Sequence, residues 1–520
     1  RCCSRIRSTG SGLLSNLFLQ NILIAMKLTK EQKDVIDFKF ENTDTLLVNA
    51  LAGTGKTSTL NEFANKRPHS SILYLAFNRS IAEEAKQKMV SNVSVSTCHS
   101  LAFKAIGKDY KDKLTNNLKA IHICEAINDP ITYKEAHFIN TAINSFCQSN
   151  ASSLDIFFEY SDNFALRAED DGVDYEKMVE YTKSVFNKMA AKEMNITHNF
   201  YLKLYQLKKY QLRFDYVLLD EAQDANDVIL DIIANQTHAK KVIVGDHFQQ
   251  IYKWNGSIDA LRKVSKDKIM NYKPKVLYLT QSFRCSEESV QYANQYLKLL
   301  SSRVAMKPAV NNKITNNDIA LIARTNAKLF ENAISHDLRK IHFLGGFDSY
   351  KFEDLIDVYY LKKGMHHEMQ NKFYSRFPSL QGLKDYDENT NDIEIENKIN
   401  MVMKYDEDIK RHYANIQRKA ASREDCNVVV TTAHKSKGQE FSCIMLTDDY
   451  FNVKDIIQKA ELLEKNEDPK PIKVRKEEFN VLYVAYTRSL NKVESPFPAP
   501  TNAEIMHFKD LSERGYIKIV

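Results

Sequence analysis

Two hydrophobic patterns alternate along most of the chain. Short runs rich in Val, Ile and Leu have almost no polar positions, and the longer stretches between them are amphipathic. The apolar runs predict strands that are buried on both faces, and the amphipathic stretches predict helices. Strands that alternate with helices are typical of parallel sheets. The pattern therefore predicts an α/β fold with parallel sheets.

The expected strands fall into two groups, which predict two α/β domains. The first group comprises Leu46–Asn49, Ile72–Phe77, Val93–Thr97, Tyr216–Asp220 and Lys241–Gly245. The second group comprises Val276–Leu279, Ile319–Ala323, Val428–Thr432 and Ile444–Leu446.

Two regions with helical patterns interrupt these groups and are predicted to be insertions. They span residues 104–196 and 349–424. This division leaves the following expected parts: 26–103 with 197–275 as the first α/β domain, 276–348 with 425–500 as the second, and 501–520 as a C-terminal tail.

Composition narrows the class of protein without identifying it. Charged residues make up 27% and apolar residues 43%, which excludes a disordered or fibrous chain. The net charge of +6 permits a polyanionic partner but does not require one. No apolar run approaches the roughly 18 residues of a membrane span, so no membrane partner is expected. The eight cysteines form no C-x-x-C pair, which favours reduced thiols in an intracellular protein.

Residues 1–25 differ in character from the rest of the chain. They carry Arg1, Arg5, Arg7 and several serines, and no acidic residue. One interpretation is a transit-like leader, which would direct the protein to an organelle. The other, which we favour, is an upstream translated extension with Met26 as the true start.

A phosphate-binding loop is predicted where the strand ending at Ala50 runs into an amphipathic stretch. The loop residues are Ala52, Gly53, Thr54, Gly55, Lys56, Thr57 and Ser58. Glycines let the backbone wrap a phosphate, and the N–H groups of the helix start face the anion. Lys56 would reach the β- and γ-phosphates, and the hydroxyl of Thr57 would bind Mg²⁺. Ala50 replaces the first glycine of the usual pattern.

A carboxylate pair supplies the second half of a nucleotide site. Asp220 and Glu221 directly follow the apolar run that begins at Tyr216. Asp220 would hold Mg²⁺, and Glu221 would orient or deprotonate the attacking water. Together with the phosphate loop, this pair predicts an ATPase or GTPase.

Further motifs follow in a fixed order. They are Leu28–Gln32, Val244–Gly256, Gln281–Arg284, Thr432–Phe441 and Glu477–Arg488. With the phosphate loop and the carboxylate strand, this set resembles the UvrD/Rep-type superfamily 1 DNA helicases from about residue 26 to about 493. Within that family, the segments 52–60, 75–79 and 198–204 look most like the helicase part of the F-box DNA helicases. No segment resembles an F-box, so no ubiquitin-ligase role is carried over.

The resemblance implies two RecA-like domains with ATP between them. Gln32 would read the adenine edge, Phe283 would stack on the adenine, and Glu440 would bind the ribose.

It also implies contacts to the γ-phosphate. Gln249 would sense this group, and Arg284 and Arg488 would reach it from the second α/β domain as arginine fingers do. With Lys56 and Glu221, these three form the expected catalytic set.

A track for single-stranded DNA is implied as well, because aromatic side chains can stack on bases of any sequence. The expected strand contacts are Phe77, Asn78, Thr97, His99, Tyr252, Trp254, Arg324, Asn326 and His434. His434 would link the strand to the nucleotide site.

The function implied by the resemblance is ATP- and Mg²⁺-dependent 3′→5′ movement on single-stranded DNA and at single-strand/duplex junctions. The setting would be recombination or repair, at intracellular DNA, by a monomer or weak oligomer. Two alternatives stay open at this point. One is a single-strand translocase that strips recombinase filaments with little unwinding. The other is a nucleotide-switched binding protein with negligible turnover.

Overall fold

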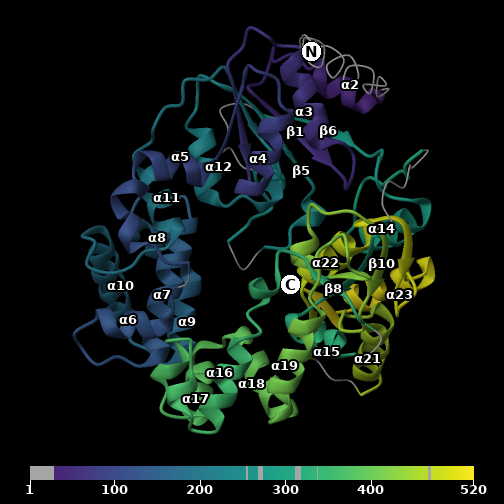
Figure 1. The fold of residues 1–520 in the computed structure, drawn as a ribbon. Helices are drawn as coiled ribbons and strands as arrows, with labels where there is room; N and C mark the ends of the chain where they lie inside the picture. The colour runs from purple at the N-terminus through teal and green to yellow at the C-terminus, as the bar shows by residue number, and fades with distance from the viewer. Residues whose placement is uncertain are drawn as a thin grey trace, which may run out of the picture.

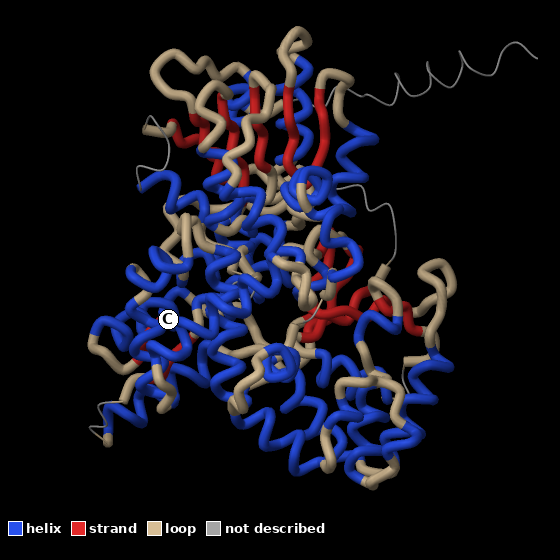
Figure 2. The backbone as a smooth tube through the Cα atoms, turned by 90° about the vertical axis from the view of Figure 1, so that its left-hand side faces the viewer, coloured by secondary structure: helices blue, strands red, loops and turns tan. Residues whose placement is uncertain are grey.

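The computed structural model describes residues 28–520 except 117, 253–255, 267–272, 311–317, 336–337 and 467–469. The segment 1–25 and Trp254 lie outside the described residues. Two parallel sheets carry the fold, and mainly helical regions connect to each of them (Figures 1 and 2). In this described part, no helix is both long and apolar enough to cross a bilayer.

The first sheet has the strand order β3-β2-β4-β5-β1-β6, with every pair parallel. Its strands are β1 (Thr45–Ala50), β2 (Ile72–Ala76), β3 (Val93–Thr97), β4 (Tyr216–Leu219), β5 (Lys240–Gly245) and β6 (Lys275–Leu279). Alternate residues of a strand point to opposite faces. Leu46 and Val48 accordingly pack with Phe63 on one face, while Leu47 joins the core on the other.

Helices cover both faces of this sheet, as expected for a buried parallel sheet. We call the sheet and its helices the first α/β part. The helices are α2 (Lys30–Ile36), α3 (Lys56–Asn65), α4 (Arg79–Lys88), α5 (Cys98–Ala105), α11 (His198–Leu207), α12 (Asp227–Ala234) and α13 (Ala260–Lys266).

The second sheet is also parallel and has the order β12-β10-β7-β9-β8. Its strands are β7 (Ile319–Ala323), β8 (Ile341–Phe343), β9 (Val428–Thr432), β10 (Phe441–Leu446) and β12 (Ser489–Glu494). The helices of this second α/β part are α14 (Glu287–Leu299), α15 (Asn326–Ile334), α20 (Ala433–Ser436), α21 (Val453–Lys465), α22 (Lys476–Tyr486) and α23 (Asn502–Glu513). The α/β prediction with two parallel sheets is confirmed.

One prediction of organisation was wrong. The sequence pattern places the strand 276–279 in the second group, but β6 pairs with β1 in the first sheet, so the chain leaves that sheet only after Leu279. An apolar strand pattern indicates burial and cannot identify the neighbouring strand. Within the predicted C-terminal tail (501–520), α23 packs in the second core and β13 (Ile517–Ile519) pairs with β11 (Ile472–Val474).

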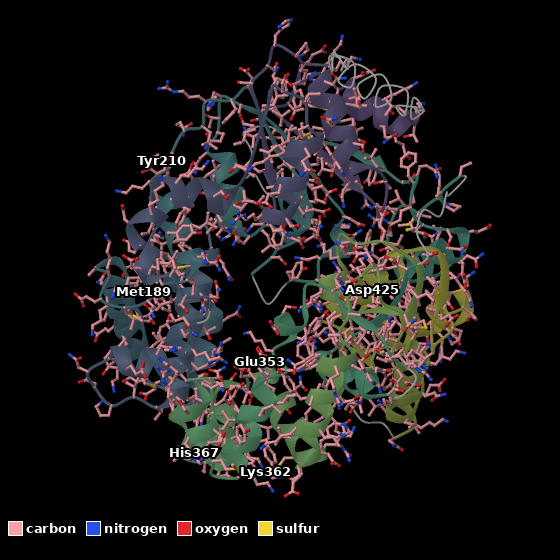
Figure 3. The ribbon with its side chains drawn as sticks, viewed as in Figure 1. Met189, Tyr210, Glu353, Lys362, His367 and Asp425 are labelled. Atoms are coloured by element: carbon pink, nitrogen blue, oxygen red, sulfur yellow. The ribbon has the colours of Figure 1, made fainter. Side chains whose placement is uncertain are left out.

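Both insertions are mainly helical, as predicted. The first insertion (104–196) contains α6 (Ala120–Ala126), α7 (Tyr133–Gln148), α8 (Leu154–Glu159), α9 (Asp162–Asp171) and α10 (Tyr175–Ala190). The second insertion (349–424) contains α16 (Asp354–Lys362), α17 (Leu380–Thr390), α18 (Ile393–Tyr405) and α19 (Asp408–Lys419). In Figure 3, Met189 lies within the first insertion and His367 at the outer end of the second.

The two insertions touch each other. The rings of Tyr133 and Tyr386 are 5.0 Å apart in an edge-to-face arrangement, and Lys119 pairs with Asp392 at 2.7 Å. The four parts therefore form a closed circuit of contacts, from the first α/β part through the two insertions to the second α/β part and back (Figure 1).

Candidate functional site

The loop between β1 and α3 adopts the conformation that phosphate binding needs. Gly53 and Gly55 have φ values of 70° and 74°, a left-handed region that favours glycine. A Cβ on Gly53 would lie 2.6 Å from the Cβ of Arg284, so only glycine permits this approach. The carbonyl of Gly53 accepts a hydrogen bond of 2.7 Å from the N–H of Phe283. The loop thus lies directly against the segment that carries Phe283 and Arg284.

Lys56 and Glu221 form an ion pair of 3.2 Å at the start of α3. Burial alone would lower the pKa of Lys56, but the carboxylates of Glu221, Asp246 and Asp220 raise it overall. Burial would raise the pKa of Glu221, but Lys56 and Lys437 hold it at about 2. Both groups are therefore charged at neutral pH. Lys56 needs its positive charge to bind phosphate, and Glu221 needs its negative charge to orient water.

Asp220 and Thr57 lie together as the prediction of a metal site requires. The Thr57 hydroxyl donates to Asp220 Oδ2 at 3.0 Å. Carboxylate and hydroxyl oxygens are hard ligands that suit Mg²⁺, which these two residues would hold with the phosphates and water. The pKa of the Asp220 carboxyl is raised by burial and by Glu221. A bound cation would favour the ionised form of Asp220.

Tyr74 is a part of this site that sequence reasoning missed. Its hydroxyl donates to Asp220 Oδ2 at 2.5 Å, and its side chain is fully buried. Tyr74 lies in the apolar run of β2, where a tyrosine is indistinguishable in sequence from ordinary core. Since β2 and β4 are neighbours, the hydroxyl fixes the orientation of the Asp220 carboxylate from the adjacent strand.

Replacing Tyr74 with Phe is expected to raise the Mg²⁺ concentration for half-maximal ATP hydrolysis by about tenfold, because groups that orient a metal ligand typically contribute that much to metal affinity. The measurement is ATPase rate against Mg²⁺ concentration at fixed ATP. Tyr216→Phe, the same change in β4, is the control. An unchanged Mg²⁺ curve for Tyr74→Phe would show that Asp220 needs no support from this hydroxyl.

The second α/β part contacts the phosphate loop through Tyr483 of α22. The Tyr483 hydroxyl accepts from the N–H of Ala52 at 3.2 Å and donates to Asp246 Oδ2 at 2.9 Å. Asp246 also accepts from Gln249 Nε2 at 3.0 Å. One hydroxyl of the second part thus joins the phosphate loop to the segment that carries Gln249. The sequence alone predicts no role for Tyr483.

Arg284 and Arg488 both lie at this junction, but they are bonded differently. Arg284 pairs with Glu440 at 2.7 Å. Arg488 is only 1% exposed, and its Nε donates to the Val484 carbonyl at 2.9 Å. Burial, and then the neighbouring charge of Arg284, lower the pKa of Arg488 to about 10. At this pKa, the guanidinium group of Arg488 remains cationic at neutral pH. Each of the two arginines must exchange a partner before it can bind a phosphate.

The predicted adenine contacts lie beside the phosphate loop. A Cβ on Gly55 would be 3.2 Å from Gln32 Nε2 and 3.6 Å from the ring of Phe283. Gln32 Nε2 donates to Thr59 Oγ1 at 3.1 Å, and Gln32 Oε1 accepts from the N–H of Thr29. These bonds hold the amide in place at the start of α3. Phe283 is 37% exposed, so its face is available for stacking.

An aromatic row begins next to the carboxylate strand. The rings of Phe77 and Tyr252 stack at 5.8 Å with 17° between their planes, and His434 lies 6.0 Å beyond Tyr252. Burial and the charge of Arg324 lower the pKa of His434 to about 4, so its imidazole is neutral at physiological pH. Tyr252, Arg324, Asn326 and His434 line one cavity of about 360 Å³.

The other predicted strand contacts are already engaged in the fold. Asn78 and Thr97 cap α4 and α5 by accepting backbone N–H bonds. His99 packs edge-on against Tyr201 at 6.3 Å. Arg324 forms a bidentate pair with Glu478, at 2.9 Å and 2.8 Å. Their roles toward a nucleic acid stay predictions.

Lys437 is a third functional candidate, after Tyr74 and Tyr483, whose role the sequence alone does not predict. From the second α/β part, its Nζ contacts Asp224 at 2.5 Å and the carbonyl of Gln249 at 2.8 Å. Burial raises the pKa of Asp224 to about 6 despite this lysine. Lys437 therefore ties the segment of His434 to both nucleotide-site segments of the first part.

Comparisons with known proteins agree with this geometry. Residues 28–268 match the UvrD/REP helicase N-terminal domain. The chain is 29% identical to F-box DNA helicase 1 of Gallus gallus over 91% of its own length and 49% of that protein's. It is 28% identical to F-box DNA helicase protein 1 of Schizosaccharomyces pombe, covering 90% of this chain and 57% of the relative.

A bacterial relative is more distant. The ATP-dependent DNA helicase PcrA of Bacillus subtilis is 22% identical over 52% of this chain and 39% of its own length. The chain spans about half the length of the F-box relatives it matches. With the phosphate loop, the carboxylate pair and the arginines in place, residues 28–268 are similar to the UvrD/REP helicase N-terminal domain, and the chain resembles the F-box DNA helicases along nine-tenths of its length.

Proposed function

We propose that this chain is an ATP-dependent motor that moves along single-stranded DNA and separates duplex DNA. The supporting observation is that the two α/β parts meet at the candidate nucleotide site, beside the aromatic row of Phe77, Tyr252 and His434. Lys437, which follows His434 in the chain, contacts Asp224 and the Gln249 carbonyl of the nucleotide site. A movement at the nucleotide site would therefore displace the segment that carries His434. Two RecA-like domains with ATP between them fit this arrangement.

Each part of the nucleotide site has a distinct task in hydrolysis. Thr57 and Asp220 would hold Mg²⁺, which would neutralise phosphate charge when bound. Glu221 orients and deprotonates the attacking water, while Lys56 binds the phosphates. Gln249, Arg284 and Arg488 stabilise the charge that develops on the γ-phosphate. Because the arginines belong to the second part, hydrolysis requires that part to close on the first.

Finer features of the proposal rest on the family resemblance. They are 3′→5′ polarity, action at single-strand/duplex junctions, and a role in recombination or repair at intracellular DNA. A strand-displacement assay with 3′- and 5′-tailed duplexes tests polarity and unwinding. Translocation without displacement would instead favour the enzyme that strips recombinase filaments.

Steady-state ATP hydrolysis is expected to increase strongly on addition of single-stranded DNA, and to fall to background in Lys56→Ala. Loss of the lysine removes the cation that binds the phosphates. The control Lys66→Ala removes an exposed lysine that follows the same helix. Duplex DNA and single-stranded RNA are tested as alternative activators of hydrolysis. A hydrolysis rate that does not change with DNA, or no hydrolysis by the wild type, would exclude the motor and leave the nucleotide-switched binding protein.

A further inference from the structure

We infer that the second insertion and the second α/β part together form a binding subsite for unstacked nucleobases, which extends the strand track beyond His434. The inference rests on the proposed function, since its ligand is the same single strand. The candidate is a cavity of about 660 Å³, within the usual size range for binding small ligands.

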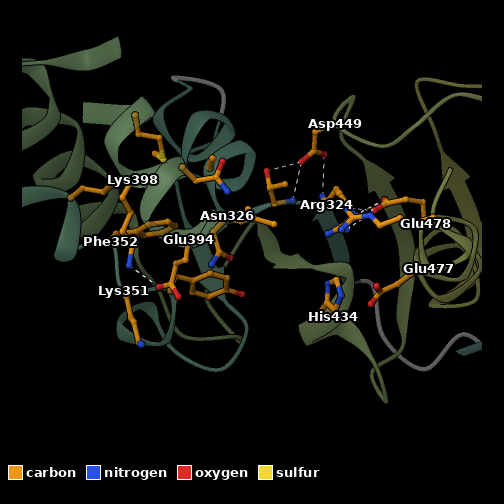
Figure 4. A pocket seen from close by; sticks show the side chains of 18 residues that line it. Arg324, Asn326, Lys351, Phe352, Glu394, Lys398, His434, Asp449, Glu477 and Glu478 are labelled. Carbon is orange, nitrogen blue, oxygen red and sulfur yellow. Dashed lines mark hydrogen bonds and ion pairs between the residues drawn. The ribbon is translucent and has the colours of Figure 1, made fainter. Parts of the chain in front are cut away.

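The cavity is continuous with the strand track. Arg324, Asn326 and His434 line both this cavity and the 360 Å³ cavity beside Tyr252. Figure 4 shows side chains of the second α/β part on one side and side chains of the second insertion on the other, with Asn326 between them. A strand that follows the aromatic row therefore reaches the insertion without a break.

The wall from the insertion suits a flat, apolar-faced ligand. Buried apolar side chains form the base of this wall, and they come from η5 (Phe347–Tyr350), the segment after it, α16 and α18: Tyr350, Phe352, Leu355 and Met401. Ile393, at the start of α18, also lines the cavity and is 61% exposed. Its exposed side chain at the cavity offers apolar surface that the face of a base could cover.

Charged groups of both signs line the cavity and balance one another. The carboxylates are Glu394, Asp449, Glu477 and Glu478, and the cations are Arg324, Lys351, Lys398 and Arg475. Glu478 is paired with Arg324, Asp449 accepts from the hydroxyl of Thr325, and Glu394 pairs with Lys398 at 2.7 Å. A neutral base can therefore enter without adding a charge to the cavity.

Cationic and amide groups complete the lining. Lys351 is exposed next to the apolar wall, where its charge can contact a strand phosphate. Asn326 and Asn397 offer amide donors and acceptors from opposite sides. With such a lining, the cavity can bind a base by stacking and by a few polar contacts.

The test is binding of fluorescent single strands to Ile393→Asp at low salt, measured by anisotropy. The probes are oligodeoxythymidine and a fully abasic strand of equal length and charge. Ile393 is exposed and is the first residue of α18, where an acidic side chain is compatible with the helix dipole, so folding should be retained. Met403→Asp, the same charge change at an exposed residue of the same helix that does not line the cavity, is the control.

We expect Ile393→Asp to bind oligodeoxythymidine at least about fivefold more weakly than the wild type, the lower end of a single base-stacking contribution. Its binding to the abasic strand and the binding of Met403→Asp should stay within about twofold. Equal weakening on both probes would mean simple charge repulsion and would overturn the subsite.

Failure of the subsite and failure of the function are distinguishable. Unchanged oligodeoxythymidine binding by Ile393→Asp, with DNA-stimulated hydrolysis intact in the wild type, overturns the subsite alone. Absence of DNA-stimulated hydrolysis in the wild type overturns the proposed function and the subsite with it.

Discussion

Arg488→Ala is expected to lower DNA-stimulated ATP hydrolysis about a thousandfold or more. An arginine that stabilises γ-phosphate charge contributes on the order of 10³ to 10⁵ to the rate in related phosphate-loop enzymes. In the structure, Arg488 lies at the end of α22 with its guanidinium bonded to backbone carbonyls and to Thr487. These hydrogen-bond partners are neutral, so a phosphate that reaches the guanidinium does not have to displace a hydrogen-bonded carboxylate.

Because Arg488 is buried, loss of activity alone could report unfolding. Arg488→Lys keeps the charge but loses the planar fork, and it should lose most of the rate while keeping its thermal transition. Arg514→Ala changes an exposed arginine of the same α/β part and serves as the control. Binding of a fluorescent ATP analogue should survive in Arg488→Lys. Full hydrolysis by that variant would assign the γ-phosphate role to another residue.

Glu221→Gln is expected to lower the maximal rate by about 10²- to 10⁴-fold, the usual contribution of a general base. The change keeps the shape of the side chain but removes the charge that pairs with Lys56. ATP affinity should not fall, because the carboxylate repels phosphate in the ground state. Single-turnover hydrolysis and nucleotide binding measure the two quantities separately.

The control for this variant is Glu83→Gln, which changes a glutamate that lies on α4 and pairs with Arg79 on the surface. Glu221 has a φ of 52°, which places its side chain in the site from a tight turn after β4. A rate within a few-fold of wild type for Glu221→Gln would mean that water is activated elsewhere, and would remove the reason for this strained backbone.

Local patterns predict the long buried strands and the phosphate loop, but not β8, β11, β12 and β13, which are short or largely polar. The burial of β1, β2 and β9 appears in sequence as short runs of apolar residues with few polar ones, and the loop glycines are required by the backbone conformation of the loop. The insertions were found because the strand pattern stops there.

Contacts between distant segments could not be predicted in this way. Tyr74 and Asp220 are 146 residues apart, and Tyr483 lies 237 residues from Asp246. Tyr74 lies in an apolar strand and Tyr483 in a mostly buried helix, and nothing in either local pattern distinguishes these tyrosines from ordinary core residues. The same limit applies to β6, whose neighbour depends on where the chain crosses between the two sheets.

The closed circuit of contacts has a mechanical consequence. Four bodies joined end to end in a loop behave as a linkage, in which no single joint can turn alone. If nucleotide closes the joint at Tyr483, strain must be absorbed by bending within a body or by sliding at another joint. The contact of Lys119 and Tyr133 with the second insertion is the joint without a covalent connection in the chain, and therefore the one with most freedom to slip. Closure at the nucleotide site would then cause a displacement of the first insertion relative to the second insertion.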